Sequence, residues 1–316
     1  MKKKLGDCII PKFICYVGLP GSGKSTHAQK SAEEYNATIF SSDALRAEWY
    51  GDENIQGDNA KLFTELHRRI KDCLREGGNA IYDATNINYK QRMAFLAELT
   101  NISCEKICVV VATPYEECLK RNAQRERKVP EKVIRKMYMQ FDIPWYFEGW
   151  DQIEVKYSEF ENSFGWTWDW VESVDNFDQN NHHHELTLGG HCRQTMHNVD
   201  KLCAEYQGFV MSSELRTAAR IHDCGKPFTK TFRNSKGEIT EEAHYYNHER
   251  VGSYDSLFYE MACSRLYVAA LIRWHMQPYF WEKDNNEKSH EKYKKLWGEN
   301  FYRDIIILHK ADKEAH

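Results

Sequence analysis

The stretch "GLPGSGKST", residues 18–26, decides the fold of the first half of the chain. It matches G-x-x-x-x-G-K-[ST] and directly follows an apolar stretch, residues 13–17, that predicts a β-strand. Glycines in such a loop let backbone amides converge on phosphate oxygens, and the helix expected from about Lys24 adds its positive N-terminal end. In loops of this kind the lysine reaches the β- and γ-phosphates and the following hydroxyl ligates Mg²⁺. The sequence therefore predicts an ATP–Mg²⁺ site formed by Gly18, Gly21, Ser22, Gly23, Lys24, Ser25 and Thr26, with Ser25 as a metal ligand.

Short apolar strands alternate with helical patterns on both sides of this loop. Strands are expected at residues 13–17, 38–43, 80–86, 107–113 and 153–158, and this alternation is typical of a parallel sheet with crossover helices. From Gly190 onward helical periodicity dominates and strand patterns vanish, most clearly at residues 264–276 and 300–312. We expect an α/β P-loop kinase domain at residues 1–160, an acidic tryptophan-rich connector at 161–178, and an all-α domain at 179–316.

The bulk composition restricts the class of protein. The chain has 316 residues, 41% of them hydrophobic, and a net charge of −4. This charge argues against a protein that coats nucleic acid, but not against one that binds a strand end through a few local cations. The ten cysteines form no C-x-x-C pair, which favours reduced thiols in the cytoplasm. No apolar run approaches the length that spans a bilayer, so no membrane association is expected.

Three further segments predict the partners of the phosphate loop. "SSDALR" places Asp43 and Arg46 at the end of the second strand, where a carboxylate can accept the proton of an attacking hydroxyl and an arginine can hold an acceptor phosphate. "DATN" places Asp83 at a Walker-B-like position, with Asn86 just after it. Residues 119–137 predict a basic helix in which Arg121 and Arg125 share one face over the γ-phosphate. The plainer alternatives are a helix-capping aspartate and a solvated charged face.

Together these motifs resemble the polynucleotide kinase branch of P-loop phosphotransferases, from about Cys8 to Ser158. The resemblance implies that Asp43 is the general base on a 5′-hydroxyl and that Arg46 binds the phosphate of the terminal nucleotide. It also implies that Arg121 and Arg125 are lid residues beside the donor phosphates. Asp83 and Asn86 of DATN are further expected substrate contacts. Related small-molecule kinases share this arrangement of motifs, so the resemblance specifies the phosphate donor better than the acceptor.

A second constellation lies in the helical half of the chain. "HDCGKP" holds His222 and Asp223, and imidazole and carboxylate are good ligands for divalent metals. Buried helices rarely carry many ionisable groups without a shared purpose. The further candidates in this half are His191, His248, His275 and Asp312.

The HDCGKP motif, together with the order His, His-Asp, His, His, Asp along the chain, resembles the HD superfamily of metal-dependent phosphohydrolases, from about Asp178 to His316. The resemblance implies one metal held by His191, His222, Asp223 and Asp312, and a second held by His248 and His275, with Asp223 as the bridge. The ion would be Mn²⁺, Fe²⁺, Ni²⁺, Co²⁺ or Zn²⁺, and Lys226 would contact the substrate phosphate. Asn247 departs from the glycine that many of these proteins carry, and His244 is the alternative to His248.

The favoured hypothesis joins the two halves in one end-healing enzyme, which phosphorylates 5′-OH ends and hydrolyses 3′-phosphate or 2′,3′-cyclic phosphate ends of RNA or DNA. A separate ligase is the expected downstream partner. One alternative is a nucleoside or metabolite kinase fused to a nucleotide-cleaving HD domain. The other is a non-catalytic, ATP-gated binding module. The run "HHH" at residues 182–184 is expected to lead into the HD domain, with one of its histidines near the metal pocket.

Overall fold

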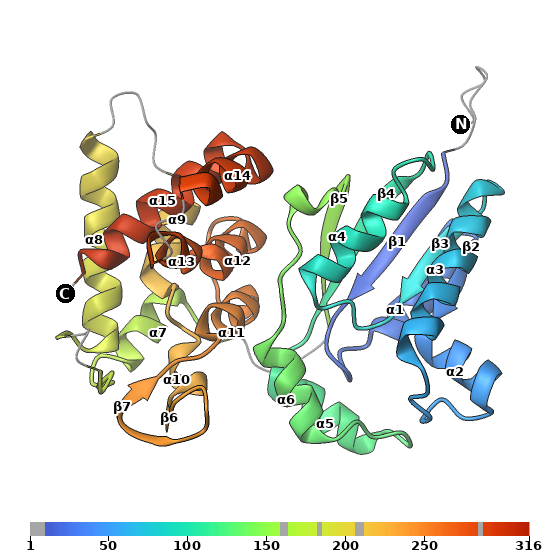
Figure 1. Ribbon diagram of the computed structural model, residues 1–316. Coiled ribbons are helices and arrows are strands. Elements are labelled where there is room, and N and C mark those ends of the chain that lie inside the picture. Colours follow the sequence, from blue (N-terminus) through green and yellow to red (C-terminus); the bar gives the residue numbers. More distant parts are fainter. Residues whose placement is uncertain (1–9, 159–163, 182–184, 206–211, 284–286, 316) are drawn as a thin grey trace. The chain divides into compact units, whose positions relative to one another are not determined.

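Five parallel strands form the sheet of the first half of the chain, in the order β2-β3-β1-β4-β5 (Figure 1). The computed structural model describes residues 10–158, 164–181, 185–205, 212–283 and 287–315. The strands are β1 (Lys12–Val17), β2 (Ala37–Ser41), β3 (Asn79–Asp83), β4 (Glu105–Ala112) and β5 (Gln152–Tyr157). All pairings are parallel, so the carboxyl ends of the strands lie along one edge of the sheet. The predicted α/β class of this half is confirmed.

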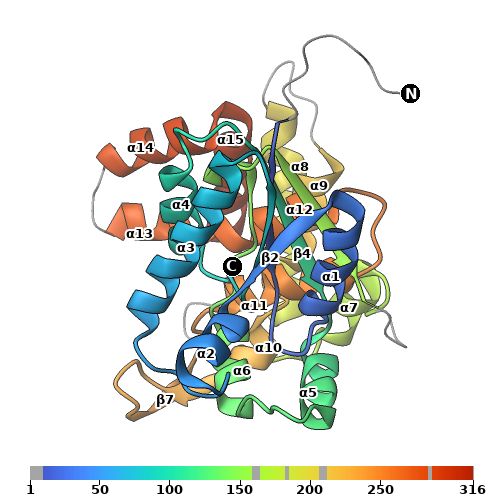
Figure 2. The same ribbon diagram turned by 90° about the vertical axis from the view of Figure 1, so that its right-hand side faces the viewer.

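Helices connect the strands. They are α1 (Lys24–Tyr35), α2 (Ser42–Tyr50), α3 (Asn59–Arg75), α4 (Tyr89–Glu98), α5 (Tyr115–Gln124) and α6 (Glu131–Met139), followed by the short helix η1 (Tyr146–Glu148). The connection from β1 to β2 runs in the opposite direction to the connection from β2 to β3, so α1 lies on one face and α3 on the other (Figure 2). Ile14, Tyr16, Ile81 and Val109 pack with Ala28 of α1 in the core.

The chain divides into two units. The first comprises residues 1–135 and 144–160, and the second comprises residues 136–143 and 161–316. Helix α6 is therefore divided at residue 135. The expected domain limits at residues 160 and 178 stay predictions.

The second unit is helical, as predicted. Its helices are α7 (Thr167–Ser173), α8 (Leu188–Glu205), α9 (Ser213–Ile221), α10 (Lys226–Thr229), α11 (His248–Asp255), η2 (Ser256–Phe258), α12 (Arg265–Trp274), α13 (Gln277–Lys283), α14 (Glu287–Trp297) and α15 (Glu299–Lys313). Helix α7 comes from the predicted acidic connector and packs on α8 and α9, where Val174 and Leu188 share a small apolar cluster with Trp170. No described helix is both long and apolar enough to cross a membrane.

The expectation that strands end before Gly190 is wrong. Strands β6 (Thr231–Arg233) and β7 (Ile239–His244) form an antiparallel hairpin. The turn between them is closed by Asn234, whose side chain accepts hydrogen bonds from the amides of Lys236 and Glu238, and by Gly237 at φ 85°. Strand β7 carries adjacent charged residues at its centre and a single buried residue, Ala243, so it lacks the apolar alternation that predicts a strand.

The single basic helix expected at residues 119–137 is also wrong. Helix α5 ends at Gln124, Arg125 has an extended backbone, and α6 starts only at Glu131. The side chain of Asn122 explains the break, because it donates to the carbonyl of Val129 (2.8 Å) and accepts from its amide (2.9 Å). Pro130 after Val129 further disfavours helical backbone at Val129. Arg121 and Arg125 therefore do not share a helix face.

Candidate functional sites

The phosphate loop connects β1 to α1 and depends on glycine at two positions. Gly21 has φ 83°, and a Cβ there would lie 2.4 Å from the carbonyl oxygen of Cys118, so a side chain fits neither the backbone nor the space. Gly23 has φ 92° and caps α1 without a side-chain hydrogen bond, leaving the first amides of the helix available. Ser25 and Thr26 lie exposed in the first turn of α1. The loop thus presents backbone donors at the carboxyl edge of the sheet.

Lys24 and Asp83 form the charged centre of this loop. Burial lowers the pKa of Lys24, and the nearby Asp83 carboxylate opposes that shift. Burial raises the pKa of Asp83, while the charge of Lys24 and a hydrogen bond with Ser25 oppose it. The Nζ of Lys24 donates to the carbonyl of Leu19 (2.8 Å). A hydroxyl and a carboxylate in contact beside a phosphate loop are the oxygen ligands that Mg²⁺ prefers, so these residues fit the implied ATP–Mg²⁺ site.

Asp43 stands in the first turn of α2, because the Ser41 side chain caps that helix. Its Oδ1 accepts from Nη1 of Arg46 (3.0 Å). The other guanidinium nitrogen, Nη2 of Arg46, donates to Oδ1 of Asn59 (2.9 Å). Among the described residues the buried Nε of Arg46 has no hydrogen-bond partner. Arg46 therefore keeps one guanidinium donor that no described protein group uses.

One residue beside Asp43 was missed by the sequence reasoning. Nη1 of Arg127 lies 2.6 Å from Oδ2 of Asp43 and 3.7 Å from Oε1 of Glu53. Arg127 belongs to the basic stretch, but nothing in its spacing separates it from its cationic neighbours.

The two arginines predicted for the lid lie near the phosphate loop. Nη1 of Arg121 is 4.0 Å from the place that a Cβ on Gly23 would occupy, and its Nε donates to Glu117 (2.8 Å). The charge of Arg125 adds to burial in lowering the pKa of Lys24. Asn86 has φ 47° and donates to the carbonyl of Tyr16 (2.9 Å), a contact that fixes the end of β3. The roles expected for these three residues stay predictions.

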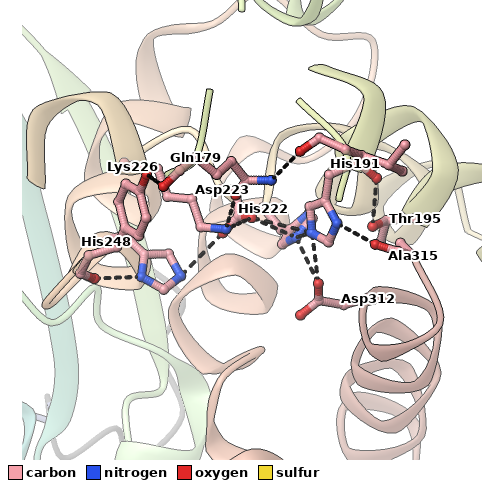
Figure 3. A network of polar contacts seen from close by, with 12 residues as sticks. Gln179, His191, Thr195, His222, Asp223, Lys226, His248, Asp312 and Ala315 are labelled. Atoms are coloured by element: carbon pink, nitrogen blue, oxygen red, sulfur yellow. Dashed lines mark hydrogen bonds and ion pairs between the residues drawn. The ribbon is translucent and has the colours of Figure 1, made fainter. Parts of the chain in front are cut away.

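The predicted histidines and aspartates of the second unit converge on one point, and Figure 3 shows His191, His222, Asp223, His248 and Asp312 of this group. His191 comes from α8, His222 and Asp223 follow α9, His248 begins α11, His275 follows α12, and Asp312 lies in α15. Nε2 of His191 is 2.9 Å from Oδ1 of Asp312 and 3.2 Å from Nε2 of His222. All six side chains are buried.

Asp223 lies at the middle of this group. Its Oδ2 is 3.3 Å from Nε2 of His222 and 3.4 Å from that of His191. Its Oδ1 is 3.2 Å from Nε2 of His248 and 4.0 Å from that of His275. The two oxygens thus face two different pairs of histidines, which is the arrangement of a bridging carboxylate.

Backbone carbonyls fix the orientation of all four imidazoles. In each histidine, Nδ1 donates to a backbone carbonyl oxygen at 2.6–2.9 Å. The pairs are His191 with Ala315, His222 with Ala219, His248 with Tyr245, and His275 with Ile272. A proton held on Nδ1 leaves Nε2 as the lone-pair nitrogen, and Nε2 is the atom that points to the centre in each case. This is the usual second-sphere arrangement of metal-binding histidines.

The charges of the group favour a cation. Burial opposes ionisation of Asp223 and Asp312, but the surrounding cationic groups hold the pKa of both carboxyls well below the usual range. Burial also disfavours the charged form of His222, yet Asp223 and Asp312 raise its pKa to about 10. Burial and the neighbouring His222 and His248 lower the pKa of His275 to about 3. In the absence of a metal, the two ionised carboxylates keep a proton on His222. A divalent ion that displaced this proton would meet two carboxylates and the imidazole nitrogens, a donor set that fits divalent metal ions.

Lys226 lies against this centre through the HDCGKP turn. Its Nζ is 2.7 Å from Oδ2 of Asp223 and 2.7 Å from Oε1 of Gln179, and it stands over the Tyr245 ring. The turn requires Gly225, because a Cβ there would lie 2.1 Å from the carbonyl oxygen of His248. Gln179 was not singled out from the sequence, since its partner is 47 residues away.

Tyr279 is a second neighbour of the centre that the sequence did not indicate. Its hydroxyl donates to Oδ2 of Asp312 (3.2 Å). His244, the alternative ligand, ends β7 and stacks on Tyr246, with ring centroids 5.5 Å apart, so the segment before His248 is not the helix that this alternative required. Asn247 takes the left-handed conformation, φ 63°, that allows His248 to start α11. Residues 182–184 lie outside the described residues.

Comparisons with known proteins agree with this division. A family model described as AAA domain matches residues 13–144, and one described as HD domain matches residues 188–315. The L-seryl-tRNA(Sec) kinase of Methanococcus maripaludis is 30% identical over 154 residues, which cover 45% of this chain and 57% of that protein. The chain thus spans little more than half of that relative.

Solved structures with a similar fold include kinases. A structure of the Pnkp1/Rnl/Hen1 RNA repair complex is 24% identical with a TM-score of 0.37, covering 42% of this chain and 44% of the other. A putative kinase from Chloroflexus aurantiacus is 16% identical with a TM-score of 0.39, covering 48% and 89%. On the two family matches, residues 13–144 form a P-loop domain of the AAA type and residues 188–315 form an HD domain.

Proposed function

We propose that this chain processes nucleic-acid ends: its P-loop domain phosphorylates 5′-hydroxyl ends with ATP and Mg²⁺, and its HD domain hydrolyses 3′-phosphate or 2′,3′-cyclic phosphate ends. The observation that carries the kinase half is the contact of Asp43 with Arg46 beside the phosphate loop. A base alone suits any acceptor hydroxyl. An arginine with an unpaired buried donor suits an acceptor that also carries a phosphate, as every nucleotide of a strand does.

The kinase residues have separate tasks in this proposal. The loop amides and Lys24 hold the donor phosphates, and Ser25 and Asp83 hold Mg²⁺. Asp43 accepts the proton of the attacking hydroxyl, and Arg46 orients the terminal nucleotide through its 3′ phosphate. Arg121 and Arg125 lie near enough to the loop to offset charge on the transferred phosphoryl group.

The HD residues would hold one or two divalent ions through their Nε2 and carboxylate oxygens. A divalent ion held there supplies Lewis-acid activation of water and of the phosphoester. Lys226 contacts Asp223 in the free protein. When substrate binds, the lysine contacts the substrate phosphate instead and orients it. The combined products, a 5′-phosphate and a 3′-hydroxyl, are the ends that a ligase joins.

A doubly modified oligonucleotide, 5′-OH and 3′-phosphate, tests both halves together, offered as RNA and as DNA with γ-labelled ATP. We expect Asp43→Asn to abolish 5′ labelling and leave 3′ dephosphorylation intact, and Asp223→Asn to do the opposite. Each variant is the control for the folding of the other. Failure of the wild-type protein to label either oligonucleotide would reject the kinase proposal, and retention of a 3′-phosphate would reject the phosphohydrolase proposal.

A second candidate acceptor for the proposed kinase is a hydroxyl group on the amino acid of an aminoacyl-tRNA. The 30% identity to a protein named L-seryl-tRNA(Sec) kinase favours it. Seryl-tRNA offered beside the 5′-OH oligonucleotide separates the two acceptors, because label that is released by mild deacylation resides on the amino acid rather than on the 5′ end.

A further inference from the structure

A cavity of about 440 Å³ opens in the first unit beside the candidate acceptor residues. Its volume is in the range of small-ligand sites. Asn59, whose Oδ1 accepts from Arg46, lines it, and so do Thr85 and Asn86, which follow β3. The carbonyl of Thr85 accepts from the amide of Gly18, the first residue of the phosphate loop (3.1 Å). The cavity therefore adjoins both Arg46 and the phosphate loop.

Five aromatic rings line the cavity. Phe63, His67, Tyr82, Phe95 and Trp150 all line it. His67 stacks on Phe95 with ring centroids 3.9 Å apart, and Tyr82 meets both rings edge-on. Nε2 of His67 also contacts the Tyr82 hydroxyl (3.3 Å). These contacts hold the wall rigid, so a flat ligand would meet a preformed surface.

The charges around the cavity are already compensated. Arg92 is held by Glu148 through two hydrogen bonds of 2.7 and 2.6 Å. Glu98 pairs with Lys71 (2.6 Å), and burial lowers the pKa of His67. A phosphate or an ammonium group would find no uncompensated partner there, and burying it would be costly. A neutral ring with a polar edge would instead meet the side chains of Asn59, Asn86 and Gln91, which also line the cavity.

We propose that this cavity binds the nucleobase of the 5′-terminal nucleotide of the acceptor strand. The base enters the aromatic cavity, its sugar brings the 5′-hydroxyl to Asp43, and the next phosphate meets Arg46. The aromatic wall recognises any base through its flat face, so binding tolerates different sequences. This inference rests on the proposed kinase function and adds the determinant that distinguishes a nucleotide acceptor from a small polar one.

Two exposed alanines of α4 give a matched pair of variants. Ala94 lines the cavity, and Ala97, one turn later on the same helix, does not. Ala94→Phe would fill the cavity, whereas Ala97→Phe adds the same ring to the same helix outside it. Ala60→Phe fills the cavity from α3 and serves as an independent second variant.

The assay compares a 5′-OH oligonucleotide with one whose 5′-terminal nucleotide has no base. We expect the wild type and Ala97→Phe to show a KM about 10-fold higher for the abasic strand, the factor typical of one stacked base. Ala94→Phe and Ala60→Phe should raise the KM of the normal strand to the abasic level and leave the KM for ATP unchanged. Thermal unfolding verifies that each variant is folded.

Equal KM values for the two strands in the wild type, or an undiminished preference in both cavity-filling variants, would overturn the inference while leaving the kinase proposal standing. No labelling of either strand by the wild type would overturn the kinase proposal itself, and the inference with it.

Discussion

Nη1 of Arg127 lies 2.6 Å from Oδ2 of Asp43, on the carboxylate oxygen opposite to the one that Arg46 contacts. The two arginines differ in their surroundings: Arg46 is buried in α2, whereas Arg127 belongs to the segment between α5 and α6 and is less enclosed. An ionised carboxylate has about four acceptor positions, so both arginines leave room for an incoming hydroxyl. Arg127 thus orients the proposed base without blocking it.

Arg127→Ala should therefore weaken the kinase without destroying the site. Loss of one hydrogen bond between charged groups costs about 1.5–3 kcal/mol, which predicts a fall of roughly 10- to 100-fold in kcat/KM for the 5′-OH acceptor. The KM for ATP should stay the same. Lys128→Ala is the control, because Lys128 is the exposed neighbour and has no part in this contact. Equal activity of Arg127→Ala and wild type would show that the contact is dispensable.

Gly21→Ala should impair the phosphate loop beyond the cost of its backbone conformation. Both Gly21 and Gly77 have φ 83°, but a Cβ on Gly21 would lie 2.4 Å from the Cys118 carbonyl oxygen and a Cβ on Gly77 would meet nothing within 4 Å. Alanine in this conformation costs about 1–3 kcal/mol by itself, and Gly77→Ala measures that cost. We expect Gly21→Ala to lose more stability in urea unfolding and at least about 10-fold in ATP affinity by calorimetry. Identical losses in the two variants would contradict the steric account.

The sequence predicted what depends on local pattern and missed what depends on distant contacts. The phosphate loop and the HDCGKP turn are short, and their glycines follow from close approaches that any such turn needs, as at Gly21 and Gly225. For His222, His248 and His275 the carbonyl partner lies only three residues earlier, so part of their orientation is local too.

Other features could not be read from the chain alone. Arg127 reaches Asp43 across 84 residues of sequence and Gln179 reaches Lys226 across 47, and neither has a spacing that marks it. The basic segment follows a helical pattern, but Asn122 binds both backbone groups of Val129 and stops the helix. The β6–β7 hairpin is charged on both faces, so its strands have no periodic apolar signal.

Asp255 should make the second unit more stable at mildly acidic than at alkaline pH. Burial raises its pKa from 3.8 to about 7, although a hydrogen bond from Tyr138 (2.6 Å) lowers it in part. The folded state then binds a proton that the unfolded state releases above about pH 4, so this contribution is full below that pH and is lost as the pH rises to about 7. Because the side chain is only partly enclosed, we expect an effect of roughly 2–4 kcal/mol.

Urea unfolding at pH 5 and pH 8 measures this effect. Asp255→Asn should reduce the difference in unfolding free energy between the two pH values. Tyr138→Phe removes the donor that favours the ionised carboxylate, so it should keep the dependence and extend it to higher pH. An unchanged difference in Asp255→Asn would assign the pH dependence to other groups.

His248 and His244 offer a direct test of which histidine belongs to the candidate metal centre. Nε2 of His248 lies 3.2 Å from Oδ1 of Asp223 with its Nδ1 proton held by Tyr245, whereas His244 stacks on Tyr246 at the end of β7. His248→Ala should lower the affinity for one divalent ion at least about 10-fold and reduce the metal content of the purified protein. His244→Ala should bind metal as the wild type does. Titration calorimetry with Mn²⁺ after removal of bound metal by a chelator gives the affinity, and elemental analysis before that step gives the metal content. A loss of metal binding in His244→Ala with full binding in His248→Ala would reverse the assignment. That result would mean that β7 and the left-handed turn at Asn247 rearrange when the metal binds.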